Sequence, residues 1–200
     1  MDRKKFLITT SLAAFSVSAF GQVKKLNNEF VGDCDTTDDI LGPFYRRDAP
    51  TRNDLTYENL TGSVIELKGH VLKSDCTTPI ENALVEIWHC NTNGDYDNKS
   101  EDFNQRAKWY TDENGEYSFK TILPGKYLNG NQFRPAHIHF RITEKNSKEL
   151  ISQIYFNGDP HIKKDPWASQ KKAEFRILPI TLEDTKGNLA VKFDIYLEDK

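Results

Sequence analysis

The chain has 200 residues, a length that fits one domain or at most two. Its 27 Lys and Arg stand against 30 Asp and Glu, and the net charge of -3 argues against a nucleic-acid-binding protein. Leu, Ile, Val and Phe together make up about a quarter of the chain, enough apolar surface to build a core, which argues against disorder. Beyond the first 21 residues no apolar stretch is long enough for a membrane span, and three cysteines are too few for a disulfide-built scaffold.

The first 21 residues have the pattern of an export signal. Residues 3–5 are basic, residues 6–20 are uncharged and mostly apolar, and Ala19 and Gly21 are small residues of the kind that signal peptidases recognise. This pattern predicts a signal peptide over 1–21 and an exported protein, either periplasmic or secreted. The basic cluster also resembles a twin-arginine signal whose second arginine is replaced, so the export route stays open.

Outside the cytoplasm disulfides persist, so the pairing of Cys34, Cys76 and Cys90 matters. Cys76 lies in a predicted turn and Cys90 ends the following predicted strand, which separates them by about seven residues at roughly 3.3 Å per residue. Bridged cysteines need Cα atoms within about 7 Å, so this spacing disfavours a Cys76–Cys90 bond. Cys34 lies in an irregular segment and is the freer partner, but which cysteine it pairs with, if either, is open.

Residues 22–60 are rich in Asn, Asp and Thr and show little periodicity, which predicts an extended N-terminal arm. From residue 61 onward, short alternating segments are separated by turn residues. We expect strands around 65–71 and at 83–89, 109–110, 117–121, 136–143, 150–156 and 190–197, and a short helical segment at 167–175. Such a series of short strands predicts an all-β domain over 61–200, a β-sandwich of mostly antiparallel strands with long loops.

Two of these strands flank the segment Asp112–Gly115, which has Asn-Gly at its centre. Asn-Gly is typical of a tight hairpin turn, because both residues tolerate a positive φ. We therefore predict a hairpin here, with Tyr110 and Tyr117 as core residues on its two arms.

The sharpest local feature is the pair His137 and His139 in a predicted strand. Residues two apart in a strand share a face, so the two imidazoles can converge on one metal ion. Ile138, Phe140 and Ile142 then point to the opposite face, into the core. The alternative is an ordinary amphipathic strand with two surface histidines.

Six sequence motifs, one of which contains this histidine pair, are spread over most of the chain beyond the predicted leader. They are GPFYR at 42–46, ALVEIWHC at 83–90 with GDY at 94–96, TD at 111–112 with GEYSF at 115–119, PGKY at 124–127, RPAHIHF at 134–140, and QIYF at 153–156 with GDP at 158–160. In this order they resemble the intradiol ring-cleavage dioxygenases, most nearly the protocatechuate 3,4-dioxygenase type, beta subunit.

The resemblance implies a mononuclear, non-haem Fe(III) held by Tyr96, Tyr127, His137 and His139. Phenolates are hard anionic donors that favour ferric iron, and this set leaves one position of a five-coordinate site for water or hydroxide. It differs from the two-histidine, one-carboxylate set of the ferrous oxygenases.

The resemblance also implies roles for three further residues. Arg134 would bind the substrate ring and stabilise its developing negative charge, Gln153 would lie close to the iron pocket, and Tyr45 would line the substrate mouth. Their alternatives are a surface ion pair, a strand-surface glutamine and a packing residue. Arg134 lies three and five residues before the histidines, so strict alternation would place it on the other face, and Pro135 must break that alternation.

The implied reaction is cleavage of a catechol-type ring by O₂ between the two hydroxylated carbons, giving a cis,cis-muconate-type diacid. Tyr127 would be displaced by the substrate and take one of its protons. Protocatechuate, catechol, hydroxyquinol and larger catechols all remain candidate substrates, and the chain could form a homo-oligomer.

Two other functions compete with this one. The first is an exported, non-catalytic β-sandwich binding module, which would have no reason to keep the four ligand residues together. The second is a zinc hydrolase built on His137 and His139, which lacks an evident third ligand because tyrosines are poor zinc ligands.

Overall fold

The structure, a computed structural model, describes residues 24–26, 29–31, 34–182 and 188–200. The signal peptide predicted at 1–21 lies outside these described residues. Within them, no helix has both the length and the apolar character needed to cross a membrane.

The first layer is a five-stranded sheet in the order β11-β10-β9-β4-β5. In chain order its strands are β4 (Leu84–Trp88), β5 (Arg106–Tyr110), β9 (His137–Thr143), β10 (Leu150–Phe156) and β11 (Ile177–Leu178). Neighbours are antiparallel except for β10 and β11, which are parallel. The histidine-bearing strand β9 is therefore central, hydrogen-bonded on both sides.

The second layer is built around one long strand, β3. In chain order its strands are β3 (Val64–Lys73), β6 (Glu116–Ile122), β12 (Thr181–Leu182), β13 (Leu189–Lys192) and β14 (Ile195–Leu197). β6 pairs antiparallel with one side of β3, and β13 and β14 follow each other along its other side, both parallel to it.

Smaller elements lie outside the two main sheets. β1 pairs with β2 and β7 with β8, both antiparallel, and two 3₁₀ helices lie between β10 and β11. The bounds are β1 Lys24–Leu26, β2 Glu29–Val31, β7 Tyr127–Asn129, β8 Gln132–Arg134, η1 Ile162–Lys164 and η2 Lys171–Arg176. η2 overlaps the helical segment predicted at 167–175.

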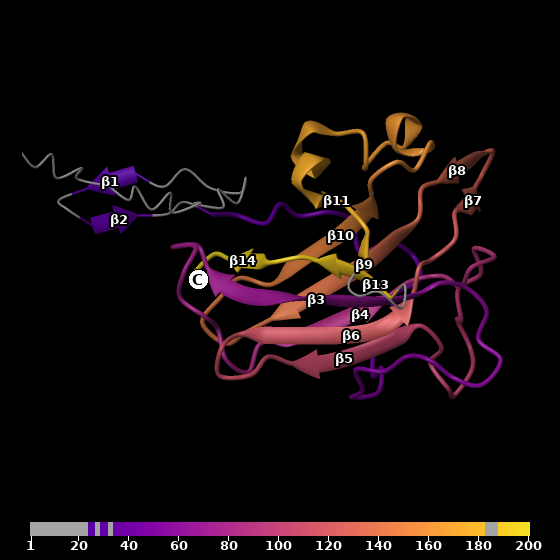
Figure 1. The fold of residues 1–200 in the computed structure, drawn as a ribbon, viewed down its shortest axis with the longest axis horizontal. Coiled ribbons are helices and arrows are strands. Elements are labelled where there is room, and N and C mark those ends of the chain that lie inside the picture. Colours follow the sequence, from indigo (N-terminus) through magenta and orange to yellow (C-terminus); the bar gives the residue numbers. More distant parts are fainter. Residues whose placement is uncertain (1–23, 27–28, 32–33, 183–187) are drawn as a thin grey trace, which may run out of the picture.

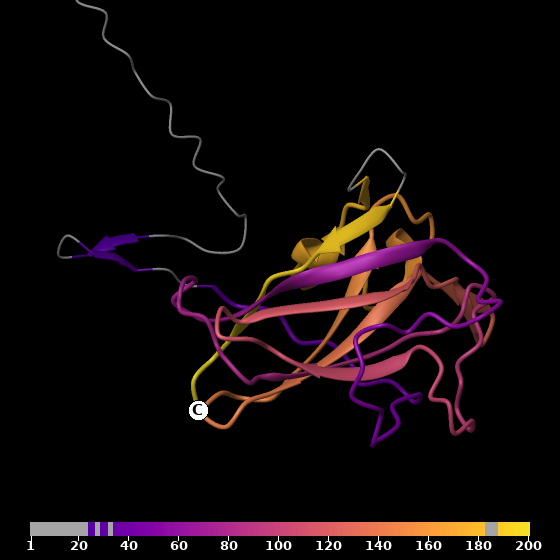
Figure 2. The same cartoon turned by 60° about the horizontal axis from the view of Figure 1, so that its bottom comes forward.

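The core lies between the two sheets, as the alternating sequence pattern requires. Ile65, Leu67 and Val71 of β3 are fully buried, and so are Ile138 and Phe140 of β9. Figures 1 and 2 show the two sheets stacked as layers, with β3 and β6 in one and β9 and β10 in the other. The predicted β-sandwich of mostly antiparallel strands is confirmed.

The hairpin predicted at Asp112–Gly115 is wrong. β5, before the turn, pairs with β4 in the first sheet, whereas β6, after it, pairs with β3 in the second. The turn therefore carries the chain from one sheet to the other. Of the two tyrosines predicted to be core residues, Tyr117 is buried but Tyr110 is 48% exposed.

The single strand predicted at 190–197 is divided into β13 and β14. Between them the Phe193 carbonyl oxygen accepts a hydrogen bond from the Tyr117 hydroxyl, at 2.6 Å. The same carbonyl lies so close to Gly69 that a Cβ there would come within 1.9 Å of it. The interruption is thus a tight crossing over β3 that only glycine at position 69 permits.

The described part of the arm, residues 34–60, packs along both sheets. Its backbone bonds to β10 through Asp39 and to β6 through Leu55, and Leu55 is buried in the core. Asp39 also forms an ion pair of 2.7 Å with Arg176, and both side chains are 1% exposed. This described part of the arm therefore lies against the sandwich.

A disulfide joins the arm to the sandwich. Cys34 is bonded to Cys76, at the end of the turn that follows β3, and Cys90 is a free, buried thiol. The bond that spacing disfavoured, between Cys76 and Cys90, is not formed, and Cys34 has the partner that the sequence left open.

Loss of this disulfide should destabilise the protein. The bond closes a loop with a sequence separation of 42, and loops of this size restrict the unfolded chain by about 4 kcal/mol. We expect the double variant Cys34→Ser, Cys76→Ser to unfold with about 3–4 kcal/mol less free energy, measured by urea denaturation. Parent protein in dithiothreitol should behave like the variant, and equal midpoints for parent and variant would contradict the prediction.

Candidate active site

The polar face of the first sheet, the one turned away from the core, carries a row of functional side chains. On β9, His137 lies opposite Tyr155 of β10, and His139 lies opposite both Gln153 of β10 and Trp88 of β4. Directly opposed residues point to the same face, so these five side chains form one contiguous surface. All five are buried.

A hydrogen bond orients one of the two imidazoles, and ring stacking orients the other. Nδ1–H of His137 donates to the Pro135 carbonyl oxygen at 2.7 Å, which leaves Nε2 free to act as an acceptor or a ligand. The His139 ring stacks on Trp88 with centroids 4.8 Å apart, and its buried Nδ1 has no hydrogen-bond partner. His137 is thus held through Nδ1, with its Nε2 next to the Tyr96 hydroxyl, whereas His139 is held by stacking and keeps one buried nitrogen without a partner.

Two tyrosines complete the group, Tyr96 from a loop and Tyr127 from the start of the short strand β7. Ring centroids are 4.9 Å apart for His137 and His139, 5.6 Å for Tyr127 and His137, 5.6 Å for Tyr96 and Tyr127, and 6.3 Å for Tyr96 and His139. The Tyr96 hydroxyl lies 3.2 Å from Nε2 of His137. The structure therefore brings the four residues predicted as iron ligands into one group, here called the four-ring cluster.

The loop that carries Tyr96 is rigidly held. The Asp97 carboxylate accepts hydrogen bonds from the backbone of Ser100 and Asn104, which lower its pKa despite the opposing effect of partial burial. Phe44 of the arm stacks on Tyr96 at 4.2 Å. Gly94 has a φ of +91°, and a Cβ there would lie 2.4 Å from the Lys126 carbonyl oxygen, so glycine is required where this loop meets the Tyr127 loop.

Arg134 reaches the same region because the ladder is interrupted at Pro135. β8 ends at Arg134 and β9 begins at His137, which is the break in alternation that the sequence required. The guanidinium donates from Nη2 to the Gln153 amide oxygen at 3.1 Å and from Nε to Asp165 at 2.8 Å. The predicted residues Arg134 and Gln153 are therefore in contact, beside the cluster.

Tyr45 is the predicted site residue that the structure does not bring into the cluster. Its ring packs edge-on against Trp88, with centroids 5.0 Å apart. Its hydroxyl donates to Glu86 at 3.2 Å and accepts from Arg141 at 3.1 Å, one step further along the sheet face. A substrate contact for Tyr45 stays a prediction without geometric support.

Burial sets the protonation states of the cluster. Burial, followed by the positive charge of Arg134, lowers the pKa of His137 to about 3, and burial also holds the pKa of His139 well below its usual value. Burial raises the pKa of Tyr96 well above 10. At neutral pH both imidazoles are neutral, which is the form that binds metals, and Tyr96 needs a nearby cation to ionise.

This donor set fits the ferric ion that the resemblance implies. Two neutral imidazoles and two phenols face one another, and one buried imidazole nitrogen lacks any partner inside the protein. Across the part of the chain that the structure describes, no three His, Cys, Asp or Glu side chains gather as a metal site would require. The cluster therefore matches neither a zinc site nor a two-histidine, one-carboxylate site.

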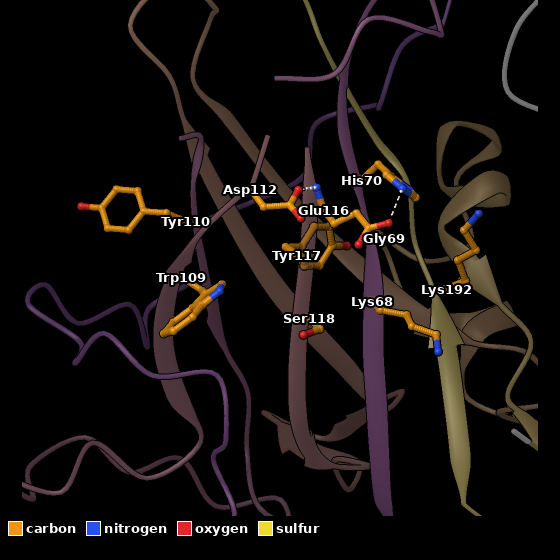
Figure 3. Close-up of a pocket in the computed structure, with 10 residues that line it drawn as sticks. All are labelled: Lys68, Gly69, His70, Trp109, Tyr110, Asp112, Glu116, Tyr117, Ser118 and Lys192. Carbon is orange, nitrogen blue, oxygen red and sulfur yellow. Dashed lines mark hydrogen bonds and ion pairs between the residues drawn. The ribbon is translucent and has the colours of Figure 1, made fainter. Parts of the chain in front are cut away.

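A surface groove lies elsewhere on the described part of the chain. It has a volume of about 540 Å³ and runs between β5 and the outer face of β3 and β6, and it contains none of the predicted site residues. Figure 3 shows its lining, where Glu116 forms an ion pair with His70 across adjacent strands, and Trp109 lies at its side. The groove is separate from the four-ring cluster.

Comparison with known proteins places this geometry in a family. The family model described as "Dioxygenase" matches residues 40–199. The protocatechuate 3,4-dioxygenase beta chain of Burkholderia cepacia is 32% identical over 167 residues, which cover 75% of this chain and 71% of the relative. The chain belongs to the intradiol ring-cleavage dioxygenase family.

Other members of the family differ in length and in name. Catechol 1,2-dioxygenase 2 of Acinetobacter lwoffii is 34% identical over 143 residues, covering 62% of this chain and 52% of that protein. The dioxygenase domain of a dioxygenase carbohydrate-binding protein fusion from Streptomyces sp. SirexAA-E superposes with a TM-score of 0.70 at 25% identity, over 83% of this chain and 99% of that domain. The chain spans about half to two thirds of the length of the first curated relatives it matches.

Three residues at the site escaped the sequence analysis. Tyr155 lies two residues after Gln153 on the same strand face, so the alternation could have identified it. Asp165 and Trp167, which contact Arg134, come from the loop between β10 and β11. They lie about 30 residues from Arg134 in an irregular segment, where no periodic signal exists.

The buried histidines predict a loss of stability in acid. His89 is fully buried, with Nδ1–H donating to the Cys90 carbonyl and Nε2 accepting from Thr121, and burial lowers its pKa to about 4. In the unfolded chain it titrates near 6.5, so between pH 6.5 and 4 only the unfolded state gains its proton. The free energy of unfolding should therefore fall as the pH falls through this window, by at most about 1.4 kcal/mol per unit for each such histidine.

The measurement is urea denaturation of the metal-free protein at pH 7, 6, 5 and 4.5. His89→Gln should be less stable overall but should lose less stability on acidification than the parent. An unchanged slope in this variant would mean that His89 does not remain neutral in the folded protein.

Proposed function

We propose that this protein is an Fe(III)-dependent intradiol dioxygenase that opens a catechol-type ring with O₂ between its two hydroxylated carbons. The product would be a cis,cis-muconate-type diacid. The observation that carries the proposal is the four-ring cluster, in which the rings of Tyr96, Tyr127, His137 and His139 lie close together on the polar face of the first sheet. Membership of the intradiol family supports the same reaction.

Iron would be held by the two imidazoles and two phenolates, and when bound it would draw electron density from a catecholate and so prepare the ring for O₂. The protein's own residues contribute position and charge. His137 and His139 are fixed on a central strand, whereas Tyr127 begins a short two-stranded ladder and is only half-buried. The Tyr127 phenolate oxygen is therefore the group that can swing away and accept a substrate hydroxyl proton.

Arg134 supplies preorganised positive charge at the same place. Burial opposes its charge, but hydrogen bonds to Asp165 and Tyr127 raise its pKa above the usual value, so the guanidinium stays protonated. A fixed cation beside a bound catecholate would stabilise the negative charge that develops on the ring. Trp88 and Phe44 line the cluster and keep water away from it.

The substrate within the catechol class is a second part of the proposal. Relatives named for catechol, chlorocatechol, hydroxyquinol and protocatechuate match at similar identity. Protocatechuate stays a candidate, supported by the 71% coverage of the protocatechuate beta chain against 52% of the first catechol enzyme. Homo-oligomer formation also stays a prediction.

We further propose that the protein is exported, to the periplasm or beyond. The leader pattern at 1–21 and the Cys34–Cys76 disulfide support this, because such bonds persist outside the reducing cytoplasm. The mature N-terminus of the secreted protein, determined by mass spectrometry, tests the cleavage after Gly21.

The first test of function is a substrate panel with the purified iron-loaded protein. We expect one iron per chain, a red-brown colour from tyrosinate-to-iron charge transfer, and muconate-type products from at least one catechol. His139→Ala should lose iron and colour but keep the circular-dichroism spectrum of the sandwich, since the core face of β9 is untouched. A colourless parent that binds no iron would instead favour a non-catalytic binding module.

The variant Arg134→Ala tests the role of Arg134 in catalysis separately from metal binding. Arg134 is not among the four ring donors, so this variant should keep its iron and its colour. Loss of one preorganised charge should slow single-turnover cleavage of a bound catechol by about 10²–10³-fold. Cleavage at the parental rate would show that Arg134 has only a structural role.

A further inference from the structure

Asp165 makes a bidentate contact with Arg134. Its Oδ2 accepts from Nε of Arg134 at 2.8 Å, and its Oδ1 lies 3.4 Å from Nη2. The side chains of Arg134 and Asp165 are 3% and 1% exposed. A paired carboxylate and guanidinium at this depth are shielded from water, which makes the contact both strong and geometrically specific.

The Asp165 carboxylate is itself fixed by its own loop. Its Oδ1 accepts the backbone N–H groups of Trp167 and Ala168, at 3.0 and 2.7 Å. These bonds, with the Arg134 contact, keep the pKa of Asp165 below its usual value although burial would raise it. The carboxylate therefore has one orientation and one charge state, so it can act as a rigid support.

Other groups enclose the guanidinium on its remaining sides. The Trp167 ring covers one face, with the Arg134 Cζ 4.3 Å from the ring centroid. Nη2 is held by the Gln153 amide oxygen at 3.1 Å and lies 3.4 Å from the Tyr155 hydroxyl. None of these hydrogen bonds uses Nη1, and a further hydrogen bond joins Arg134 to the Tyr127 side chain, which belongs to the four-ring cluster.

We infer that Asp165 is a positioning residue that fixes the Arg134 guanidinium beside the four-ring cluster. The inference rests on the proposed function. Asp165 acts through Arg134 and touches neither substrate nor ligand residues. It comes from a loop that carries no other site donor, and its buried negative charge is matched to the one buried guanidinium it contacts.

The opposing explanation is that Asp165 only caps its own loop. The variant Asp165→Asn distinguishes these two explanations. Its amide oxygen can still accept hydrogen bonds from the backbone of Trp167 and Ala168, but the negative charge that faces Arg134 is lost. The variant is measured alone and in the Arg134→Ala background. Glu86→Gln serves as the matched control, because it removes a buried carboxylate from another arginine pair on the same sheet, with Arg141.

Two measurements use the iron-loaded protein. One is the single-turnover rate of catechol cleavage, and the other is the affinity for 4-nitrocatechol without oxygen, followed by its visible spectrum. With Arg134 present, Asp165→Asn should slow cleavage at least tenfold and weaken nitrocatechol binding severalfold, at unchanged iron content and colour. In the Arg134→Ala background the same change should have no further effect, and Glu86→Gln should match the parent.

Equal losses from Asp165→Asn in both backgrounds, or no loss with Arg134 present, would overturn the inference. If Asp165→Asn alone does not fold, we compare the double variant Arg134→Ala, Asp165→Asn with Arg134→Ala. The double variant leaves no unpaired buried charge. Equal rates and affinities then support the inference, and a further loss overturns it.

A third measurement does not depend on catalysis. In the metal-free protein, the Nε–H of Arg134, identified in NMR spectra by its absence from Arg134→Ala, should exchange slowly with solvent, and at least tenfold faster in Asp165→Asn. A parent that binds nitrocatechol but cleaves no catechol would refute the proposed function, while nitrocatechol affinity and Nε–H exchange would still decide the role of Asp165. Unchanged exchange in the variant would overturn the inference.

Discussion

The structure depends on one constraint: β9 is a central strand that is buried on both of its faces. Alternation sends Ile138 and Phe140 into the apolar core and His137 and His139 to the opposite face. A sheet face that carries buried imidazoles cannot be closed by apolar packing alone, since each polar group must find a partner. The arm and the loops supply that cover, and the four-ring cluster lies beneath them.

The charged side chains around the two imidazoles lie at defined positions. Positive groups, Arg134 and Arg106, lie near the imidazoles and help to keep them neutral. The nearby carboxylate, Asp165, is committed to Arg134 by direct contact. The phenols of Tyr96 and Tyr127 are the side-chain oxygens whose rings lie against those of the histidines. In the proposed iron site these phenols would be the anionic donors.

Some of this arrangement could be predicted from sequence, because strand periodicity is a local property. The buried faces of β3 and β9 follow directly from alternation, and the shared direction of His137 and His139 follows from their spacing. The placing of Tyr96 and Tyr127 came from matching motifs to a known family, because loop conformation is not encoded in a repeating pattern.

The predictions that were wrong involve tertiary contacts. Asn-Gly at 114–115 indicates a turn, but which sheet the following strand joins depends on the register of Tyr117 and Phe119 against β3. The strand at 190–197 is interrupted because a carbonyl must pass close to Gly69, a feature of another strand. Asp165 lies in an irregular loop, and its role appears only once that loop has folded over Arg134.

The arm is bonded directly to the residues around Arg134. Gln153 donates to the Ile40 carbonyl, and the Tyr155 hydroxyl donates to Asp39, so the side chains that hold Arg134 are themselves held by the arm. Asp39 is anchored in turn by its buried ion pair with Arg176. Because buried polar networks are stable only when every member is satisfied, loss of the arm would leave several of these groups unpaired. A boundary between residues 60 and 61 divides the sequence by composition, but these hydrogen bonds connect Asp39 and Ile40 directly to the residues that hold Arg134.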